Sequence, residues 1–223
     1  MAKTFIKQLL LWILIILIIV ITLYFWSKPK RKFYICSYGG CGSTILYKYL
    51  SNFGDAYHIH SRFPPQNLTL VEKANDIDSR FTDVEIGDAD LSNYTVIYIY
   101  RNPIHAIYSR FEIPVHLTNI GSDDKITIQD VVDSHLDLYG IGEFYDNYTG
   151  SHGRNYKTYC VKYEDFFDNI ELFNDAIGLD NRPELYPVKS ETERKCPQYN
   201  ELYPIYSDLI GKQERSDFIT HLS

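Results

Sequence analysis

The sequence has few cysteines and no excess of positive charge. Four cysteines in 223 residues are too few for a disulfide scaffold, and no Cys-x-x-Cys pair indicates a zinc site. The 22 basic and 29 acidic side chains give a formal net charge of −7. Binding to the phosphate backbone of a nucleic acid requires a basic surface. We therefore expect no nucleic-acid partner.

Internal repeats and low-complexity stretches are also absent, and the composition is otherwise ordinary. Hydrophobic residues make up 45% of the chain and charged residues 23%. These proportions fit one folded domain and exclude a disordered, collagen-like or multi-pass membrane protein.

One long apolar run is present near the start of the chain, from Leu9 to Trp26. A membrane-spanning helix needs about 20 apolar residues at a rise of 1.5 Å each, so this run predicts a transmembrane helix. It lacks the short apolar core and the small-residue cleavage site of a signal peptide. The predicted organisation is a tail over 1–8, a transmembrane helix over 9–26, a basic stem over 27–32 and a folded domain over 33–223.

The orientation of this helix stays open at the sequence level. More basic residues follow the run (Lys28, Lys30, Arg31 and Lys32) than precede it (Lys3 and Lys7). By the positive-inside rule this asymmetry favours a cytosolic domain. Against it, three glycosylation triplets begin at Asn67, Asn93 and Asn147 and favour a lumenal domain.

The rest of the chain alternates strand and helix patterns. Apolar runs predict strands over 33–37, 95–100 and 156–161, and a further strand is expected to end near His60. Helical spacing predicts helices over 43–53, from Pro103, over 126–148 with a possible break near Gly140, over 163–177 and over 199–222. Such alternation predicts an α/β fold: a three-layer parallel sheet with flanking helices, in which ligands bind beyond the carboxyl ends of the strands.

A glycine-rich turn links the first predicted strand to the first predicted helix. It reads Gly39-Gly40-Cys41-Gly42-Ser43-Thr44. The glycines let the backbone approach a ligand closely, and the two hydroxyls stand at a helix start that favours anions. The turn therefore predicts a phosphate or sulfate cradle, or else simply a tight packing turn. It is not a Walker A loop, because no lysine precedes Ser43.

A second motif follows the strand over 95–100. Arg101 leaves this strand next to Asn102-Pro103, and Ser109 stands eight residues later in the following helix. The planar guanidinium suits a phosphate, and the serine adds a hydroxyl. The alternative is that Arg101 pairs with a structural carboxylate.

These two motifs, together with Tyr163-Glu164-Asp165, resemble the sulfotransferase family in the same order along the chain. The resemblance implies a P-loop-like fold and the sulfuryl donor 3′-phosphoadenosine-5′-phosphosulfate (PAPS), with no metal. It implies that the loop Gly39 to Thr44 holds the donor's 5′-phosphosulfate, that Arg101 and Ser109 bind its 3′-phosphate, and that Tyr163 packs near the adenine. Many family members are single-pass, Golgi-anchored enzymes that sulfate glycans or proteins.

The sequence departs from the family at one position. The family loop usually carries Lys or Arg two residues before its last glycine, where this chain has Gly40. Loss of a charge aimed at developing negative charge costs about a hundred-fold in rate. Lys48 and Arg62 are the nearest substitutes by sequence, and Lys48 is the predicted catalytic cation. Alternatively, the protein binds a nucleotide on a membrane without catalysis. A small-molecule kinase is disfavoured by the missing loop lysine.

The segment His58-Ile59-His60 supplies candidate general bases. A histidine suits this role because its ordinary pKa lies near working pH. His60, nearest the expected strand end, is the predicted base, and His58 would share its face as second choice. The spacing of the two histidines also suits a metal, but no third ligand is evident. The insertion from Pro64 to Ser92 is expected to shape acceptor specificity.

Overall fold

The computed structural model describes residues 11–20, 31–64, 94–150, 156–189 and 195–222. The chain divides into two compact units, Met1–Lys30 and Arg31–Ser223. In the first unit, residues 11–20 are helical. Within the described residues, no helix combines the length and apolar character needed to cross a membrane. The predicted span over 9–26 extends beyond these residues on both sides.

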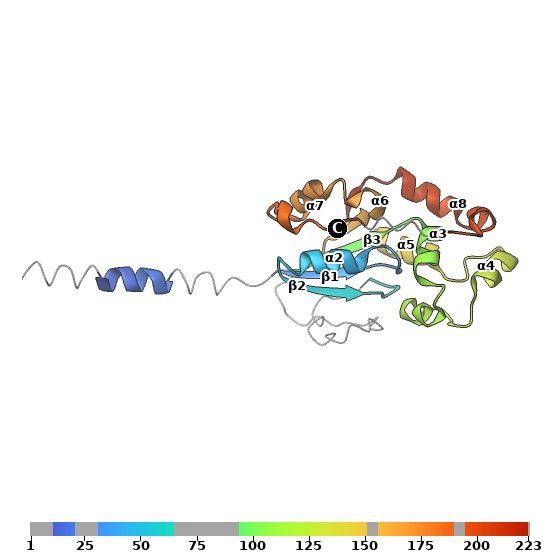
Figure 1. Ribbon diagram of the computed structural model, residues 1–223, viewed down its shortest axis with the longest axis horizontal. Coiled ribbons are helices and arrows are strands. Elements are labelled where there is room, and N and C mark those ends of the chain that lie inside the picture. The colour runs from blue at the N-terminus through green and yellow to red at the C-terminus, as the bar shows by residue number, and fades with distance from the viewer. Residues whose placement is uncertain (1–10, 21–30, 65–93, 151–155, 190–194, 223) are drawn as a thin grey trace, which may run out of the picture. The chain divides into compact units, whose positions relative to one another are not determined.

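The second unit is built on a five-stranded, mostly parallel sheet (Figure 1). Its strand order is β2-β1-β3-β4-β5. The first four strands are parallel to one another, and β5 pairs antiparallel with β4. The bounds are β1 Lys32–Cys36, β2 Asp55–Ile59, β3 Tyr94–Tyr100, β4 Thr158–Lys162 and β5 Ile219–Leu222.

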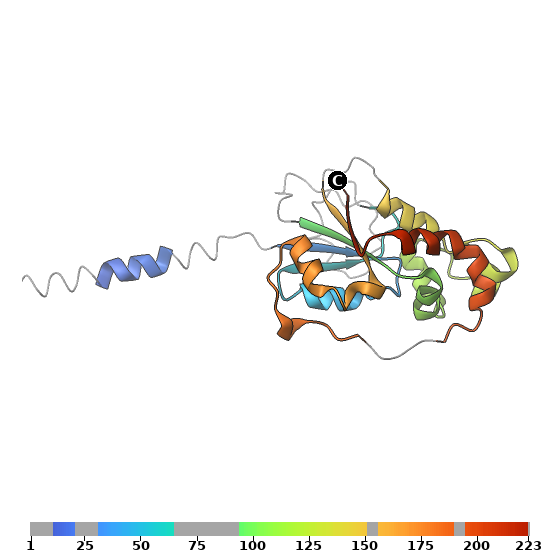
Figure 2. The ribbon, with the colours of Figure 1, turned by 90° about the horizontal axis from the view of Figure 1, so that it is seen from above.

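Helices cover both faces of this sheet, as the alternating strand residues require. On one face Phe33, Ile35 and Ile97 pack against α2 (Ser43–Leu50), α6 (Tyr163–Phe166) and α7 (Ile170–Ile177). The remaining bounds are α3 Pro103–Arg110, η2 Pro114–Ile120, α4 Ile128–Ser134, α5 Ile141–Thr149, η3 Pro183–Leu185 and α8 Tyr199–Arg215. On the other face Tyr34, Cys36 and Tyr98 pack against α3, α4, α5 and α8. Figure 2 shows α2 and α7 on one side of the strands and α5 and α8 on the other.

Two predicted helices need correction. The helix predicted over 199–222 ends at Arg215, and its last residues form β5, so the sheet is not wholly parallel. The helix predicted over 163–177 is two helices, because the chain turns at residues 167–169 between α6 and α7. The break predicted near Gly140 is confirmed, because the pattern over 126–148 forms α4 and α5, separated by a turn that ends at Gly140.

The order of the strands changes direction at β1. From β1 the chain proceeds to β2 on one side, and it then returns to β3 on the other side of β1. The carboxyl ends of β1 and β3 are therefore the topological switch point of the sheet, where open α/β sheets bind their ligands. The glycine-rich turn follows β1, and Arg101 follows β3.

Candidate functional site

The turn from β1 to α2 depends on its glycines. Gly39, Gly40 and Gly42 have φ values of 93°, 67° and 78°, which side chains with a Cβ rarely adopt. A Cβ on Gly40 would lie 2.5 Å from the Ala106 carbonyl oxygen, and a Cβ on Gly42 would lie 2.3 Å from the Tyr163 ring. The turn is therefore packed tightly against α3 on one side and Tyr163 on the other.

Arg101 points at this turn. Its Nη1 donates a hydrogen bond to the Gly40 carbonyl oxygen at 3.3 Å, and its guanidinium carbon lies 4.8 Å from the centre of the Tyr163 ring. Its Nε lies 3.9 Å from a Glu164 carboxylate oxygen. Within the described part of the chain this buried Nε has no hydrogen-bond partner. Arg101 is thus held in place while its Nε–H forms no hydrogen bond.

The glycine turn and Arg101 line one cavity of about 250 Å³. Nine residues singled out from the sequence share this cavity: Gly40, Gly42, Ser43, Thr44, His58, His60, Arg101, Ser109 and Tyr163. The other lining residues are Ile45 and Arg110. None of these described lining residues is acidic, although the whole chain carries an excess of acids. The wall of the cavity therefore combines two guanidiniums with hydroxyls and imidazoles, a composition that favours an anion.

Three residues of the predicted site are not among those that line this cavity. Gly39 does not line the cavity, and its N–H donates to Ser37 Oγ at 3.1 Å. Cys41 is buried, its Sγ donates to the Gly39 carbonyl at 3.0 Å, and burial raises the pKa of the thiol well above its ordinary value. Lys48 is exposed on α2. The structure therefore does not bring Lys48 to the site as the substitute cation.

A buried polar chain connects the glycine turn to the end of β2. Ser37 Oγ donates to Ser43 Oγ at 2.9 Å, and His58 Nε2 lies 2.7 Å from the same Ser43 oxygen. His60 Nδ1 lies 2.8 Å from the Ser37 carbonyl oxygen and 3.4 Å from Ser37 Oγ. A carbonyl oxygen only accepts, so His60 Nδ1 carries the proton and Nε2 carries the lone pair. His60 is therefore held in the tautomer of a base.

Both histidines are neutral at pH 7. Burial, together with the nearby His60 and Arg110, lowers the pKa of His58 to about 3. The pKa of His60 is lowered to about 4, mainly by burial and also by Arg110 and His116, while the hydrogen bond to the Ser37 carbonyl opposes the decrease. A neutral imidazole can accept a proton, but this pKa makes His60 a weaker base than the ordinary value near working pH from which its role was predicted.

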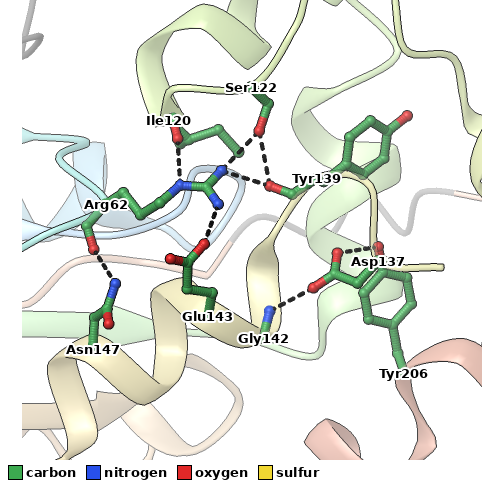
Figure 3. A network of polar contacts seen from close by, with 9 residues as sticks. All are labelled: Arg62, Ile120, Ser122, Asp137, Tyr139, Gly142, Glu143, Asn147 and Tyr206. Atoms are coloured by element: carbon green, nitrogen blue, oxygen red, sulfur yellow. Dashed lines mark hydrogen bonds and ion pairs between the residues drawn. The ribbon is translucent and has the colours of Figure 1, made fainter.

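Arg62, the second substitute considered from the sequence, belongs to a different network. Figure 3 shows its guanidinium enclosed by partners on η2 and α5 and in the turns beside them. Its Nε and Nη groups donate to Ile120 O at 3.0 Å, Glu143 Oε2 at 2.7 Å, and Ser122 Oγ and Tyr139 O at 2.9 Å each. Four of the five guanidinium donors are thus engaged, and Arg62 is a structural residue.

Arg110 is the cation of the cavity that sequence reasoning missed. It is the last residue of α3, and the stem of its side chain lies against Gly39, with Cγ 3.1 Å from the position of an added Cβ. The one available signal was its place directly after Ser109. The sequence does not reveal that α3 packs on the glycine turn, and this packing brings Arg110 into the cavity.

A larger cavity of about 370 Å³ lies between α5, α8 and β5. Of its charged residues, Lys212 is paired with Asp146 at 2.8 Å. This cavity contains none of the residues of the two motifs. Among the described residues there is also no group of three His, Cys, Asp or Glu side chains that would hold a metal ion.

Comparison of the chain with protein-family models, with curated proteins and with solved structures returns no match.

Proposed function

We propose that this protein is a membrane-anchored sulfotransferase that moves a sulfuryl group from PAPS to a hydroxyl or amine of a glycan or protein acceptor. The observation that carries the proposal is the single cavity shared by the Arg101 guanidinium and the glycine turn before α2. The cavity lies at the switch point of the sheet, where nucleotides bind in other α/β folds.

The residues of the cavity fit an anionic nucleotide. The start of α2 offers the backbone N–H groups of Ser43 and Thr44 and the exposed Thr44 hydroxyl to a phosphosulfate, whereas the Ser43 hydroxyl is engaged with Ser37 and His58. Arg101 and Ser109, which both line the cavity, would hold the 3′-phosphate. A volume of about 250 Å³ suits the anionic groups of a nucleotide, since whole ligand sites span about 300 to 1,000 Å³.

For Tyr163 we propose a main role other than the packing near the adenine that the family resemblance implies. Its ring stacks on Arg101 and packs against Gly42. Tyr163 therefore orients the guanidinium toward the glycine turn, and contact with the adenine is an additional role that we keep as a proposal.

His60 is the proposed general base. Its Nδ1–H is bound to the Ser37 carbonyl, so its Nε2 is the atom that would receive the acceptor's proton. His58 is less suited to this role because its Nε2 is engaged with Ser43.

Calorimetry with adenosine-3′,5′-bisphosphate on the full-length protein in detergent tests the proposal. We expect binding that Arg101→Ala weakens by about a hundred-fold, since a charge-assisted hydrogen bond contributes up to about 3 kcal/mol. Arg182→Ala, an exposed arginine outside the cavity, is the matched control. Absence of binding, or equal binding by both variants, would refute the proposal. Transfer of labelled sulfate that is lost in His60→Gln would establish catalysis.

Gly40 favours one alternative function, a nucleotide-binding module without catalysis. In the sulfotransferase family the corresponding position usually carries a cation, whereas here an added Cβ would meet the α3 backbone. This alternative requires bisphosphate binding with no transfer to any acceptor in a panel of glycans and peptides.

The membrane anchor is proposed from the first unit. Residues 11–20 are all apolar, and nine of them have exposed side chains: Leu11, Trp12, Ile13, Leu14, Ile16, Leu17, Ile18, Ile19 and Val20. Exposed apolar side chains around a whole helix suit a lipid environment. We also propose a Golgi-type, lumenal location on the basis of the family resemblance and of the glycosylation triplets at Asn67 and Asn93, against the distribution of basic residues, which favours a cytosolic domain.

A further inference from the structure

The proposed reaction needs a cation beside the transferred group, and the glycine turn does not provide one. Gly40 occupies the position where the family resemblance calls for Lys or Arg. Lys48 is exposed on α2 and does not line the cavity, and the Arg62 guanidinium donates to four acceptors in its own network.

Arg110 lines the cavity and its charge lacks a partner. Within the described residues, its guanidinium makes no ion pair and no side-chain hydrogen bond. It is half-buried, and burial lowers its pKa. Buried charges in proteins are normally paired, because removal from water is costly. A half-buried guanidinium that opens into a cavity without acids is therefore suited to pair with a bound anion.

Arg110 and Arg101 line the same cavity from different elements. Arg101, after β3, stacks on Tyr163 and lies near Glu164, which is not among the residues that line the cavity. Arg110, at the end of α3, lines the cavity together with His58 and His60, and its charge acts on both histidines. The other groups beside His60 are His58 on β2, His116 on η2 and the Ser37 carbonyl.

We infer that Arg110 is a catalytic residue that contacts the sulfuryl group of the donor and supplies the cation missing from the glycine turn. This inference rests on the proposed function. In the reaction, the acceptor oxygen or nitrogen forms a bond to sulfur and its proton passes to His60 Nε2. The bond from sulfur to the bridging oxygen breaks, and its electron pair stays on that oxygen, which leaves with adenosine-3′,5′-bisphosphate. Arg110 stabilises the negative charge that develops on the bridging oxygen as its bond to sulfur breaks.

The stem of Arg110 lies against Gly39, with Cγ 3.1 Å from the position of an added Cβ. A charge that already lies beside the reacting groups acts more strongly in a cleft than in water. This close contact is a second reason for glycine at residue 39, besides its positive φ.

Two variants of the full-length protein test the inference. Arg110→Gln removes the charge and keeps most of the length, whereas Arg110→Lys keeps the charge. Lys125→Gln, at an exposed site outside the cavity, is the control for loss of one positive charge. The first probe is inorganic sulfate, titrated by calorimetry at constant ionic strength. We expect Arg110→Gln to weaken sulfate binding at least ten-fold, Arg110→Lys to restore part of it and Lys125→Gln to leave it unchanged.

The second readout is sulfate transfer from PAPS. We expect Arg110→Gln to lower kcat about a hundred-fold and to raise the KM for PAPS by no more than the loss of sulfate affinity, because the contact strengthens in the transition state. Arg110→Lys should recover part of kcat. Unchanged kcat in Arg110→Gln would overturn the inference, as would unchanged sulfate affinity or the absence of sulfate binding in the unmodified protein.

The two proposals fail separately. If sulfate binds through Arg110 but adenosine-3′,5′-bisphosphate does not bind, the anion site stands, while the sulfotransferase proposal and the catalytic role of Arg110 are overturned together. If the bisphosphate binds through Arg101 and transfer proceeds equally in Arg110→Gln, the sulfotransferase proposal stands and the inference about Arg110 is wrong.

Discussion

The Tyr38 hydroxyl in the glycine turn is hydrogen-bonded to both backbone groups of Arg101 at the end of β3. It accepts a hydrogen bond from the Arg101 N–H at 3.0 Å and donates one to the Arg101 carbonyl. The two residues are 63 positions apart in the sequence. This link fixes the two halves of the cavity to each other.

We expect Tyr38→Phe to lower the free energy of unfolding by about 1 to 3 kcal/mol, because both Arg101 backbone groups lose a buried partner. Tyr98→Phe is the matched control. The Tyr98 hydroxyl is buried without a hydrogen-bond partner in the described part of the chain, so its removal should be neutral or slightly stabilising. Denaturant unfolding measures both. Equal losses in the two variants would contradict the role assigned to Tyr38.

Gly42 provides a second matched comparison. Gly42 and Gly178 have φ values of 78° and 69°, but only at Gly42 would a Cβ collide with another residue, the Tyr163 ring. We expect Gly178→Ala to lower the free energy of unfolding by about 1 kcal/mol through backbone strain alone. Gly42→Ala should lower it further and abolish bisphosphate binding, because Tyr163 and Arg101 must move. If Gly42→Ala were as stable as Gly178→Ala and still bound the bisphosphate, the contact between Gly42 and Tyr163 would not be important for the site.

The stability of the fold should depend on pH through His60. Its pKa is lowered to about 4 in the folded chain, mainly by burial, and is about 6.5 when unfolded. Between these values the unfolded state binds more protons, so the free energy of unfolding falls as pH decreases from about 6.5 to 4. The expected loss is on the order of 3 kcal/mol. Unfolding measured across this range should show a shallower slope in His60→Gln and an unchanged slope in His135→Asn, an exposed control.

Arg62 and Glu143 form an ion pair, and we expect the two side chains to contribute unequally to the free energy of unfolding. The Arg62 side chain is 15% exposed and donates to four groups, whereas the Glu143 side chain is 56% exposed. We expect Arg62→Gln to lower the free energy of unfolding by about 3 kcal/mol, because buried carbonyls lose their donors. Glu143→Gln should cost less than about 1 kcal/mol, as for surface pairs. Thermal unfolding compares the two, and a larger effect of Glu143→Gln would contradict the structural role of Arg62.

The glycosylation triplets can determine the membrane orientation. Asn147 lies inside α5, and its side-chain amide donates to the Arg62 carbonyl at 3.2 Å, so a glycan there is incompatible with the fold (Figure 3). Asn67 and Asn93 lie outside the described residues. If the domain is lumenal, Asn67→Gln and Asn93→Gln should each abolish one glycan shift on a gel, and Asn147→Gln should abolish none. A chain without glycans in cells would contradict the lumenal proposal.

The sequence was informative where local pattern determines structure. The strands over 33–37, 95–100 and 156–161 were predictable because buried parallel strands are runs of apolar, β-branched and aromatic residues. The meeting of the glycine turn with Arg101 followed from the rule that parallel strands end at the same edge of a sheet. Its chemical role stays a prediction.

Other features depend on contacts between distant parts of the chain. The four residues of β5 carry too little pattern to be distinguished from the end of a helix, and pairing with β4 determines their conformation. The partners of Arg62 lie 58 to 85 residues away, so its network has no local signal. Arg110 reads as an ordinary basic residue at a helix end, and only the packing of α3 on Gly39 distinguishes it.

The basic wall of the cavity belongs to a chain whose overall charge is −7. A polyanion diffusing toward this molecule is repelled at long range and attracted only near the mouth of the cleft. Dissolved ions weaken the distant repulsion, with a Debye length of about 10 Å at 0.1 M, more than they weaken contacts inside a half-buried site. Moderate ionic strength should therefore speed the capture of such a ligand, the reverse of electrostatic steering by an oppositely charged surface.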